Sequence, residues 1–196
     1  MTGKSRMDWQ TLSERIIYER LPWLKLIEQD VRLPNGVVIE NYLISETPDV
    51  AMMFAVTRSG EAIFVEQYKQ GIQSLSLDLS AGYMDETDHS PLSAARRELE
   101  EETGYVSEDW THLASLVIDP NRSSAQIHYY LARNCRQTGT QHLDPTEELR
   151  VQVMPLAEVE SLVFAGRVTT VSSAAGIAMG LQALRKTRPS GPAPAM

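Results

Sequence analysis

The chain has 196 residues, 42% of them hydrophobic and 22% charged, and its 26 acidic and 18 basic side chains give a net charge of −8. This composition is apolar enough for a folded core and excludes a chain that is disordered throughout. The negative charge excludes the basic surface typical of nucleic-acid-binding proteins. At about 150 residues per domain, the length indicates one domain with short terminal extensions.

Turn residues divide the first half of the chain into expected strands. Residues 1–25 are weakly patterned and are expected to form an N-terminal arm or a short strand. The Pro-Asn-Gly sequence at 34–36 and the Ser-Gly pair at 59–60 have the backbone preferences of tight turns, and each separates two runs of β-forming residues. The strands expected from these runs, and from the alternating pattern after them, cover residues 26–33, 37–45, 50–57, 62–68 and 75–79.

The second half of the chain combines helices with strands. Ser90 and Pro91 provide an N-cap and a first helical position, and the helix that they begin ends at the Thr-Gly pair 103–104. These elements predict an α+β fold, with a main domain over residues 26–186 and a disordered, Pro-rich tail over 187–196. The further strands are expected at 113–118, 126–132 and 149–154, and the further helices at 155–166 and 169–186.

The sequence has the features of a cytoplasmic protein. Its N-terminal residues lack the apolar core of a signal peptide, and no stretch approaches the ~18 uncharged apolar residues of a membrane span. Cys135 is the single cysteine, which excludes an intramolecular disulfide and favours a reducing compartment. We therefore expect a cytoplasmic location and no membrane partner.

The negative charge is concentrated in one short segment. Residues 85–109 contain nine acidic and two basic side chains, whereas the other 171 residues contain 17 acidic and 16 basic ones. Within the expected helix, Glu98, Glu101 and Glu102 are three and four positions apart and share one face, while Leu99 belongs to an apolar stripe that would pack on a sheet. The acidic face is either a solvated helical surface or a rigid set of oxygen ligands for a divalent cation such as Mg²⁺.

Residues 97–105, with the sequence RELEEETGY, resemble the second half of the Nudix box, whose pattern is R-E-aliphatic-x-E-E-x-G-hydrophobic. Every specified position of that half is filled, with an aromatic residue at the last. Flanking segments at 65–69, 77–82, 119–120 and 126–132 resemble those of ADP-ribose pyrophosphatases, in the same order. The resemblance implies a Nudix-type α/β/α sandwich around a mixed β-sheet, with an N-terminal β-rich arm.

The resemblance also implies roles for residues of the box. In this family the box carboxylates, here Glu98, Glu101 and Glu102, bind Mg²⁺ or Mn²⁺. By position, the backbone carbonyl of Ala81 is a further candidate ligand. Arg97 would orient Glu101 rather than contact the substrate, although a plain pair on the helix surface fits the sequence equally well.

The first half of the box departs from the family pattern. One residue is inserted after Gly82, and the expected glutamate is absent. Glu86, Asp88 and His89 are the residues near enough to take its place.

Outside the box, three further roles follow from the resemblance. Lys69 replaces the usual arginine and would contact phosphate as a point charge. The Ser-Ala pair at 124–125 stands where related enzymes carry acidic residues, so Glu147 or Glu148 is the candidate general base from a late loop. Trp23 would stack on the nucleobase across a homodimer, as N-terminal aromatic residues do in this subfamily, or it would pack in the core.

The function implied is Mg²⁺-dependent hydrolysis of ADP-ribose to AMP and ribose 5-phosphate by a homodimer acting on this small molecule. Two alternatives stay open. Lys69 and the Ser-Ala pair favour another nucleoside diphosphate sugar or a dinucleotide as substrate. The missing box glutamate favours a Nudix-fold binding module with little catalysis, whereas three like charges on one helix face favour a cation-dependent enzyme.

Overall fold

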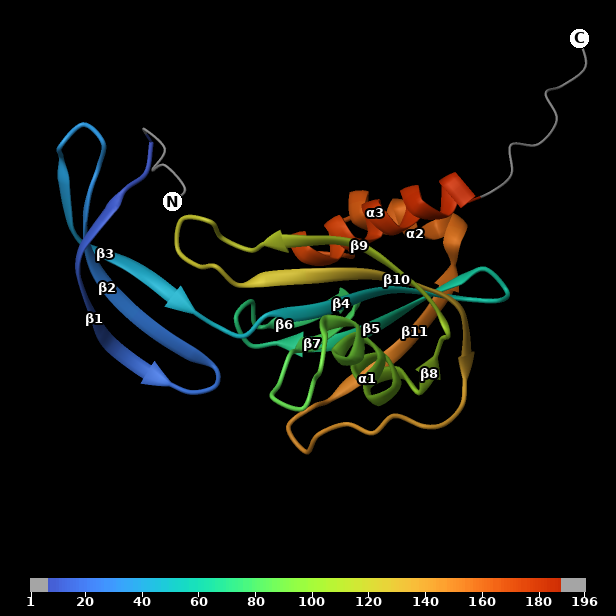
Figure 1. The fold of residues 1–196 in the computed structure, drawn as a ribbon. Coiled ribbons are helices and arrows are strands. Elements are labelled where there is room, and N and C mark those ends of the chain that lie inside the picture. The colour runs from blue at the N-terminus through green and yellow to red at the C-terminus, as the bar shows by residue number, and fades with distance from the viewer. Residues whose placement is uncertain (1–6, 188–196) are drawn as a thin grey trace, which may run out of the picture. The chain divides into compact units, whose positions relative to one another are not determined.

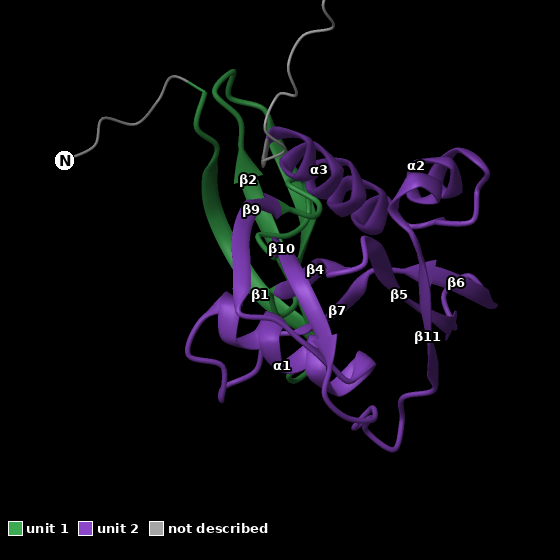
Figure 2. Cartoon of the chain, turned by 90° about the vertical axis from the view of Figure 1, so that its right-hand side faces the viewer, with its two compact units in different colours: residues 1–49, 117–126 green, residues 50–116, 127–196 purple. Residues whose placement is uncertain are grey.

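The computed structural model describes residues 7–187. The chain divides into two compact units (Figure 2), one comprising residues 1–49 and 117–126 and the other residues 50–116 and 127–196. Of the tail predicted at 187–196, all but the first residue lie outside the described part of the chain. Within that part, no helix is both long and apolar enough to cross a membrane.

The first unit contains a three-stranded antiparallel sheet made of β1 (Gln10–Arg20), β2 (Leu24–Arg32) and β3 (Val38–Glu46). The two expected strands in this region are confirmed as β2 and β3, and most of the expected arm is a full strand, β1, which pairs along β2. Gly36, at φ +88°, lies in the turn before β3, where the sequence predicted one. The domain boundary predicted after residue 25 stays a prediction, and β2 runs across it.

Large aromatic side chains of the first unit lie at its surface. Trp9 is 50% exposed and packs edge-on against Tyr42, and Trp23, in the turn between β1 and β2, is 58% exposed. The buried side chains of this sheet are instead Ile27 and Val31 of β2. The alternative interpretation of Trp23 as a core residue is therefore wrong.

The second unit is built on a mixed eight-stranded sheet whose main path runs β11-β5-β4-β10-β8 (Figure 1). β4 and β10 are parallel, whereas β5 is antiparallel to both β4 and β11. The expected strands are found within a few residues of their predicted ends, and the short strands β7 and β8 were not predicted. The strands are β4 (Val50–Thr57), β5 (Glu61–Lys69), β6 (Ser74–Asp78), β7 (Ser80–Tyr83), β8 (Tyr105–Val106), β9 (Asp109–Val117), β10 (Gln126–Gln137) and β11 (Leu149–Pro155).

Helices cover both faces of this sheet, with α1 on one side and α2 and α3 on the other (Figure 1). Alternate residues of β4 face opposite layers: Phe54 belongs to the cluster that includes Ile177 of α3, and Met53 to the cluster that includes Leu99 of α1. The predicted α+β class and Nudix-type sandwich are confirmed. The helices are α1 (Pro91–Thr103), α2 (Leu156–Phe164) and α3 (Val171–Thr187).

We predict that Leu99→Ala lowers the free energy of unfolding by roughly 2–5 kcal/mol, the range for deleting a fully buried leucine side chain. Leu99 is completely buried between α1 and the sheet. Urea unfolding followed by circular dichroism measures the change. Glu100→Ala, at an exposed position of the same helix, is the matched control and should change the unfolding free energy little. Equal effects of the two substitutions would contradict the packing described here.

Candidate active site

The acidic face belongs to a helix, α1, whose two ends are fixed. Ser90 Oγ accepts a hydrogen bond from the Ser93 N–H at 3.1 Å, and Ser93 Oγ accepts one from the Ser90 N–H at 2.9 Å, which completes a capping box. At the other end, Gly104 has φ +71° and donates its N–H to the Glu100 carbonyl at 2.8 Å. A Cβ at Gly104 would lie 2.7 Å from the carbonyl oxygen of Gly139, so packing also requires glycine there.

Glu98 packs directly against the backbone of β7. A Cβ on Gly82 would lie 2.0 Å from both Cδ and Oε1 of Glu98, so only glycine leaves room for this carboxylate. Burial raises the pKa of Glu98; Arg97 opposes the shift, and the charges of Glu101 and Glu147 reinforce it. The Glu98 carboxylate is thus desolvated beside other negative charges, which is a favourable position for a cation.

Glu102, one helical turn further along α1, is also buried, with 6% of its surface exposed. Its Oε2 accepts a hydrogen bond from the Ala81 N–H of β7 at 3.1 Å. Burial, together with the charges of Glu98 and Glu147, raises the pKa of Glu102 to about 8. Two of the three predicted carboxylates therefore lie side by side along the same strand.

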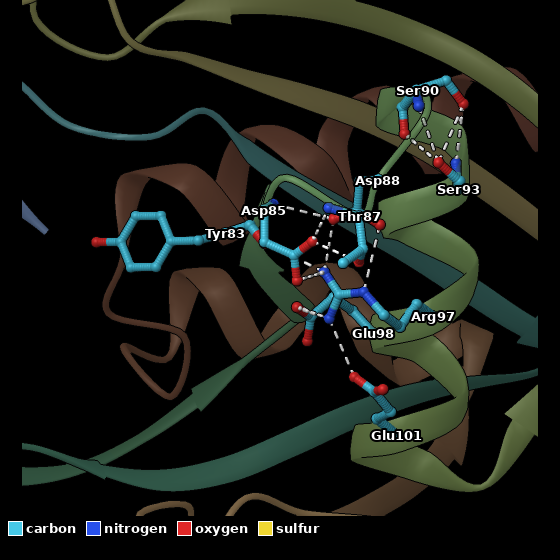
Figure 3. A network of polar contacts seen from close by, with 9 residues as sticks. All are labelled: Tyr83, Asp85, Thr87, Asp88, Ser90, Ser93, Arg97, Glu98 and Glu101. Carbon is cyan, nitrogen blue, oxygen red and sulfur yellow. Dashed lines mark hydrogen bonds and ion pairs between the residues drawn. The ribbon is translucent and has the colours of Figure 1, made fainter. Parts of the chain in front are cut away.

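Arg97 holds the acidic face together (Figure 3). Its Nη1 donates to Glu98 Oε1 at 2.7 Å and to Glu101 Oε2 at 3.0 Å, and its Nη2 donates to Asp88 Oδ2 at 2.8 Å. The pairing of Arg97 with Glu101 that the sequence allowed is present. The side chain of Asp88 is 3% exposed, and Arg97 lowers the pKa of Asp88.

The contact with Arg97 distinguishes Asp88 from the other two residues considered for the missing box glutamate. Asp88 Oδ2 also accepts a hydrogen bond from the Asp85 N–H at 3.0 Å, so the loop before α1 folds back on itself. Sequence spacing could not choose among the candidates, because the inserted residue shifts the register and only the loop conformation decides which acid reaches the arginine.

The segment between β10 and β11 is attached to the C-terminal turn of α1. Gln141 Nε2 donates to the Glu102 carbonyl at 2.7 Å, and the His142 N–H donates to the Glu101 carbonyl at 2.8 Å. The sequence analysis missed Gln141, because a lone glutamine in a loop carries no motif. These two bonds satisfy carbonyl groups that the end of a helix leaves without intrahelical partners.

The same segment brings Glu147 near the acidic face. Its charge raises the pKa of both Glu98 and Glu102, whereas Glu148 is exposed and influences neither. Glu147 Oε2 accepts a hydrogen bond from the Asp144 N–H at 3.1 Å, which fixes the turn before β11. Of the two late-loop acids left open by the sequence, Glu147 is the one beside the box carboxylates.

A pocket of about 120 Å³ adjoins Glu102. Lys69, at the end of β5, lines it and donates to Gln67 Oε1 at 2.6 Å. Trp23 belongs to the first unit and does not line this pocket. The other lining residues are Met52, Val65, Asp78, Leu79, Ala81, Thr170, Ser172 and Ser173.

The buried acids have the chemistry of a divalent-cation site. In the described residues no three His, Cys, Asp or Glu side chains are arranged to enclose a metal ion. Glu98 and Glu101 instead accept hydrogen bonds from Arg97. Glu98 and Glu102 are nevertheless desolvated carboxylates with raised pKa values, and a cation would offset their repulsion. Oxygen ligands of this kind fit Mg²⁺.

A match to a family model decides the family to which the chain belongs. The description "NUDIX domain" matches residues 46–170, and "Nucleoside diphosphate sugar hydrolase N-terminal domain" matches residues 9–43. The chain belongs to the Nudix hydrolase family. The matched region contains α1 and all three box carboxylates, so the resemblance stated from the sequence is confirmed.

Individual Nudix proteins are similar over much of the chain. The methanol dehydrogenase activator of Bacillus methanolicus is 33% identical over 56% of this chain and 58% of its own length. The ADP-ribose pyrophosphatase of Bacillus subtilis is 28% identical over 79% of this chain and 83% of its own. A crystal structure of an ADP compounds hydrolase superimposes with a TM-score of 0.80 at 22% identity, covering 93% of this chain and 97% of the other, which shows the shared fold.

We predict that Gly82→Ala displaces the Glu98 carboxylate from β7, because the new Cβ would lie 2.0 Å from its Oε1. If the cation binds at Glu98, the variant should need at least about tenfold more Mg²⁺ for half-maximal hydrolysis, because the end of the Glu98 side chain has to move. Metal titration of activity measures this effect. Gly71→Ala, whose Cβ would meet nothing within 4 Å, is the control. An unchanged metal requirement in Gly82→Ala would refute the close approach.

Proposed function

We propose that this Nudix hydrolase cleaves ADP-ribose to AMP and ribose 5-phosphate in a reaction that requires Mg²⁺ or Mn²⁺. The observation that carries the proposal is the pair of buried carboxylates, Glu98 and Glu102, held one turn apart along β7. The similarity to ADP-ribose pyrophosphatase supports the choice of substrate. Water adds across the diphosphate: one P–O bond to the bridging oxygen breaks, and each product keeps one phosphate.

The metal-binding residues in this proposal are Glu98, Glu101, Glu102 and the backbone carbonyl of Ala81. When bound, the cation polarises the diphosphate and offsets charge on its non-bridging oxygens. Arg97 positions Glu98 and Glu101, since it donates to both carboxylates. A cation bound by Glu98 would replace one of the arginine contacts, and the bond to Asp88 would keep the guanidinium of Arg97 in place.

The catalytic residues in this proposal are Glu101, Glu102 and Glu147. Glu147 removes a proton from the attacking water, because it approaches the box from a separate loop and leaves the box carboxylates to the metal. Lys69, at the pocket beside Glu102, binds a phosphate oxygen of the substrate. Its ammonium acts as a point charge and cannot form the two-pronged contact of an arginine.

The nucleobase contact in this proposal is Trp23, which stacks on the base as part of a homodimer. Trp23 is 58% exposed, and a large exposed aromatic side chain is suited to such stacking. β1 also exposes Ile16, Ile17 and Tyr18 by 46% or more, an apolar surface of the kind that association covers. Sedimentation of the purified protein tests the dimer, and a monomer at micromolar concentration would refute it.

A second candidate substrate is another nucleoside diphosphate sugar or a dinucleotide. Lys69 favours it, because a single ammonium constrains the orientation of a phosphate less than an arginine does. A panel of nucleoside diphosphate sugars and dinucleotides, assayed with and without Mg²⁺, decides between the substrates.

We propose a cytoplasmic setting, in which the buried thiol of Cys135 stays reduced.

We predict that Glu102→Gln lowers Mg²⁺-dependent turnover at least about a hundredfold, because a metal contributes several kcal/mol of charge stabilisation to the transition state. At a pH above the raised pKa of Glu102, about 8, where this residue is ionised, the amide should also raise the melting temperature of the metal-free protein, since it removes a buried charge. Mg²⁺ should stabilise the wild type alone. Hydrolysis assays and thermal melts measure these effects. Glu100→Gln, exposed on α1, is the control. Mg²⁺-dependent turnover of Glu102→Gln at the wild-type rate would sink the proposal.

We predict that Glu147→Gln lowers kcat by about 10²–10⁴, the usual contribution of a general base, and leaves the Mg²⁺ requirement unchanged. The amide cannot accept the proton of water, so the loss should fall on the chemical step. Initial-rate kinetics at several Mg²⁺ concentrations measure both effects. Glu148→Gln is the neighbouring control. A larger loss of kcat in Glu148→Gln than in Glu147→Gln would show that Glu147 is not the general base.

A further inference from the structure

Asp78, at the end of β6, is a buried acid with one carboxylate oxygen bonded and one without a partner. Its Oδ1 accepts hydrogen bonds from Thr170 Oγ1 at 2.5 Å and from Ser173 Oγ at 2.9 Å. Its Oδ2 is buried and has no hydrogen-bond partner in the described part of the chain. The residue is 6% exposed, so little solvent reaches it. A buried acceptor without a donor destabilises the protein unless a ligand or water supplies one.

The hydrogen bonds to Oδ1 give Asp78 a structural role. Ser173 Oγ also accepts a hydrogen bond from the Leu79 N–H at 3.1 Å, so the carboxylate, the serine and the backbone form one chain of hydrogen bonds. Through it, Asp78 attaches the first turn of α3 to the sheet. A single acceptor oxygen is enough for this role, which leaves Oδ2 without a structural function.

Asp78 lines the pocket beside Glu102, together with Lys69, Gln67 and Ser172. The pocket measures about 120 Å³, whereas sites for whole drug-sized ligands begin at about 300 Å³. It therefore accommodates one portion of a nucleoside diphosphate compound. The portion must carry hydrogen-bond donors for Asp78 and lie next to a phosphate within reach of Lys69.

We propose that this pocket is the subsite for the sugar attached to the diphosphate, and that Asp78 Oδ2 accepts a hydrogen bond from one of its hydroxyl groups. The inference rests on the proposed function and names the portion of the substrate that the pocket selects. Hydroxyl groups both donate and accept, which suits a wall that contains two carboxylates, one amide and the hydroxyl groups of serine and threonine. A cationic group is disfavoured, because Lys69 lines the same small pocket.

Two substrates test the subsite. ADP-ribose is compared with the cyclopentylmethyl ester of ADP, which keeps the diphosphate and a five-membered ring but has no hydroxyl group on that ring. The wild type should favour ADP-ribose in kcat/KM by about tenfold to a hundredfold, the range for one hydrogen bond to a charged acceptor, chiefly through KM. Equal kcat/KM values for the two substrates would overturn the proposal.

Asp78→Asn tests the role of Oδ2, the oxygen without a hydrogen-bond partner. The asparagine carbonyl can still accept from Thr170 and Ser173, while the second oxygen becomes an NH₂ group that donates. The variant should keep its melting temperature. Its preference for ADP-ribose over the ester should fall by about tenfold, because the NH₂ group can bind a hydroxyl oxygen only through a weaker, uncharged hydrogen bond. An unchanged preference would overturn the proposal.

Ser76→Ala is the matched control for a purely structural effect. Ser76 lies on the same strand as Asp78, and its hydroxyl bonds to Thr169 Oγ1 at 3.1 Å, so it attaches β6 to the same segment without lining the pocket. This variant should melt at a lower temperature and keep the wild-type preference. If Ser76→Ala lowers the preference for ADP-ribose as much as Asp78→Asn does, Asp78 acts through the fold and the proposal is wrong.

Binding of ribose 5-phosphate separates the two proposals. If the wild type hydrolyses neither substrate, the proposed function fails, and calorimetric titration with ribose 5-phosphate then decides the subsite. About tenfold weaker binding by Asp78→Asn than by the wild type supports the subsite. Equal affinities, or no binding by the wild type, overturn it.

Discussion

The second unit depends on holding two carboxylates, Glu98 and Glu102, against the backbone of β7. Each is largely removed from water, and the two charges repel one another, so the arrangement opposes folding unless other groups compensate. Gly82 leaves the space for one carboxylate, and the Ala81 N–H bonds to the other. A bound divalent cation would compensate this repulsion, because both carboxylates would then face a positive charge.

The surrounding structure keeps the acidic face rigid without neutralising it. Leu99 packs α1 on the sheet, a capping box begins the helix, and Gly104 ends it. Arg97 supplies one positive charge, which it shares among Glu98, Glu101 and Asp88, so the face keeps a net negative charge. The helix is thereby fixed in position while its carboxylates keep an uncompensated negative charge.

The two faces of the sheet serve different parts of the proposed reaction. On one side, α1 presents the carboxylates that would hold the cation. On the other, Thr170, just before α3, and Ser173, in its first turn, bond to one oxygen of Asp78 and leave the other to the pocket. Glu102 lines that same pocket, so the proposed metal site and sugar subsite meet at one residue.

Local patterns were sufficient to predict most elements and the box helix. Turn residues, the Ser-Pro helix start and the three aligned glutamates act within a few positions of one another, so the sequence shows them directly. The approach of Glu147, the partnership of Asp88 with Arg97 and the exposure of Trp23 required the tertiary structure. Each depends on how a loop folds back or which surface is covered, and these contacts join residues whose spacing follows no local period.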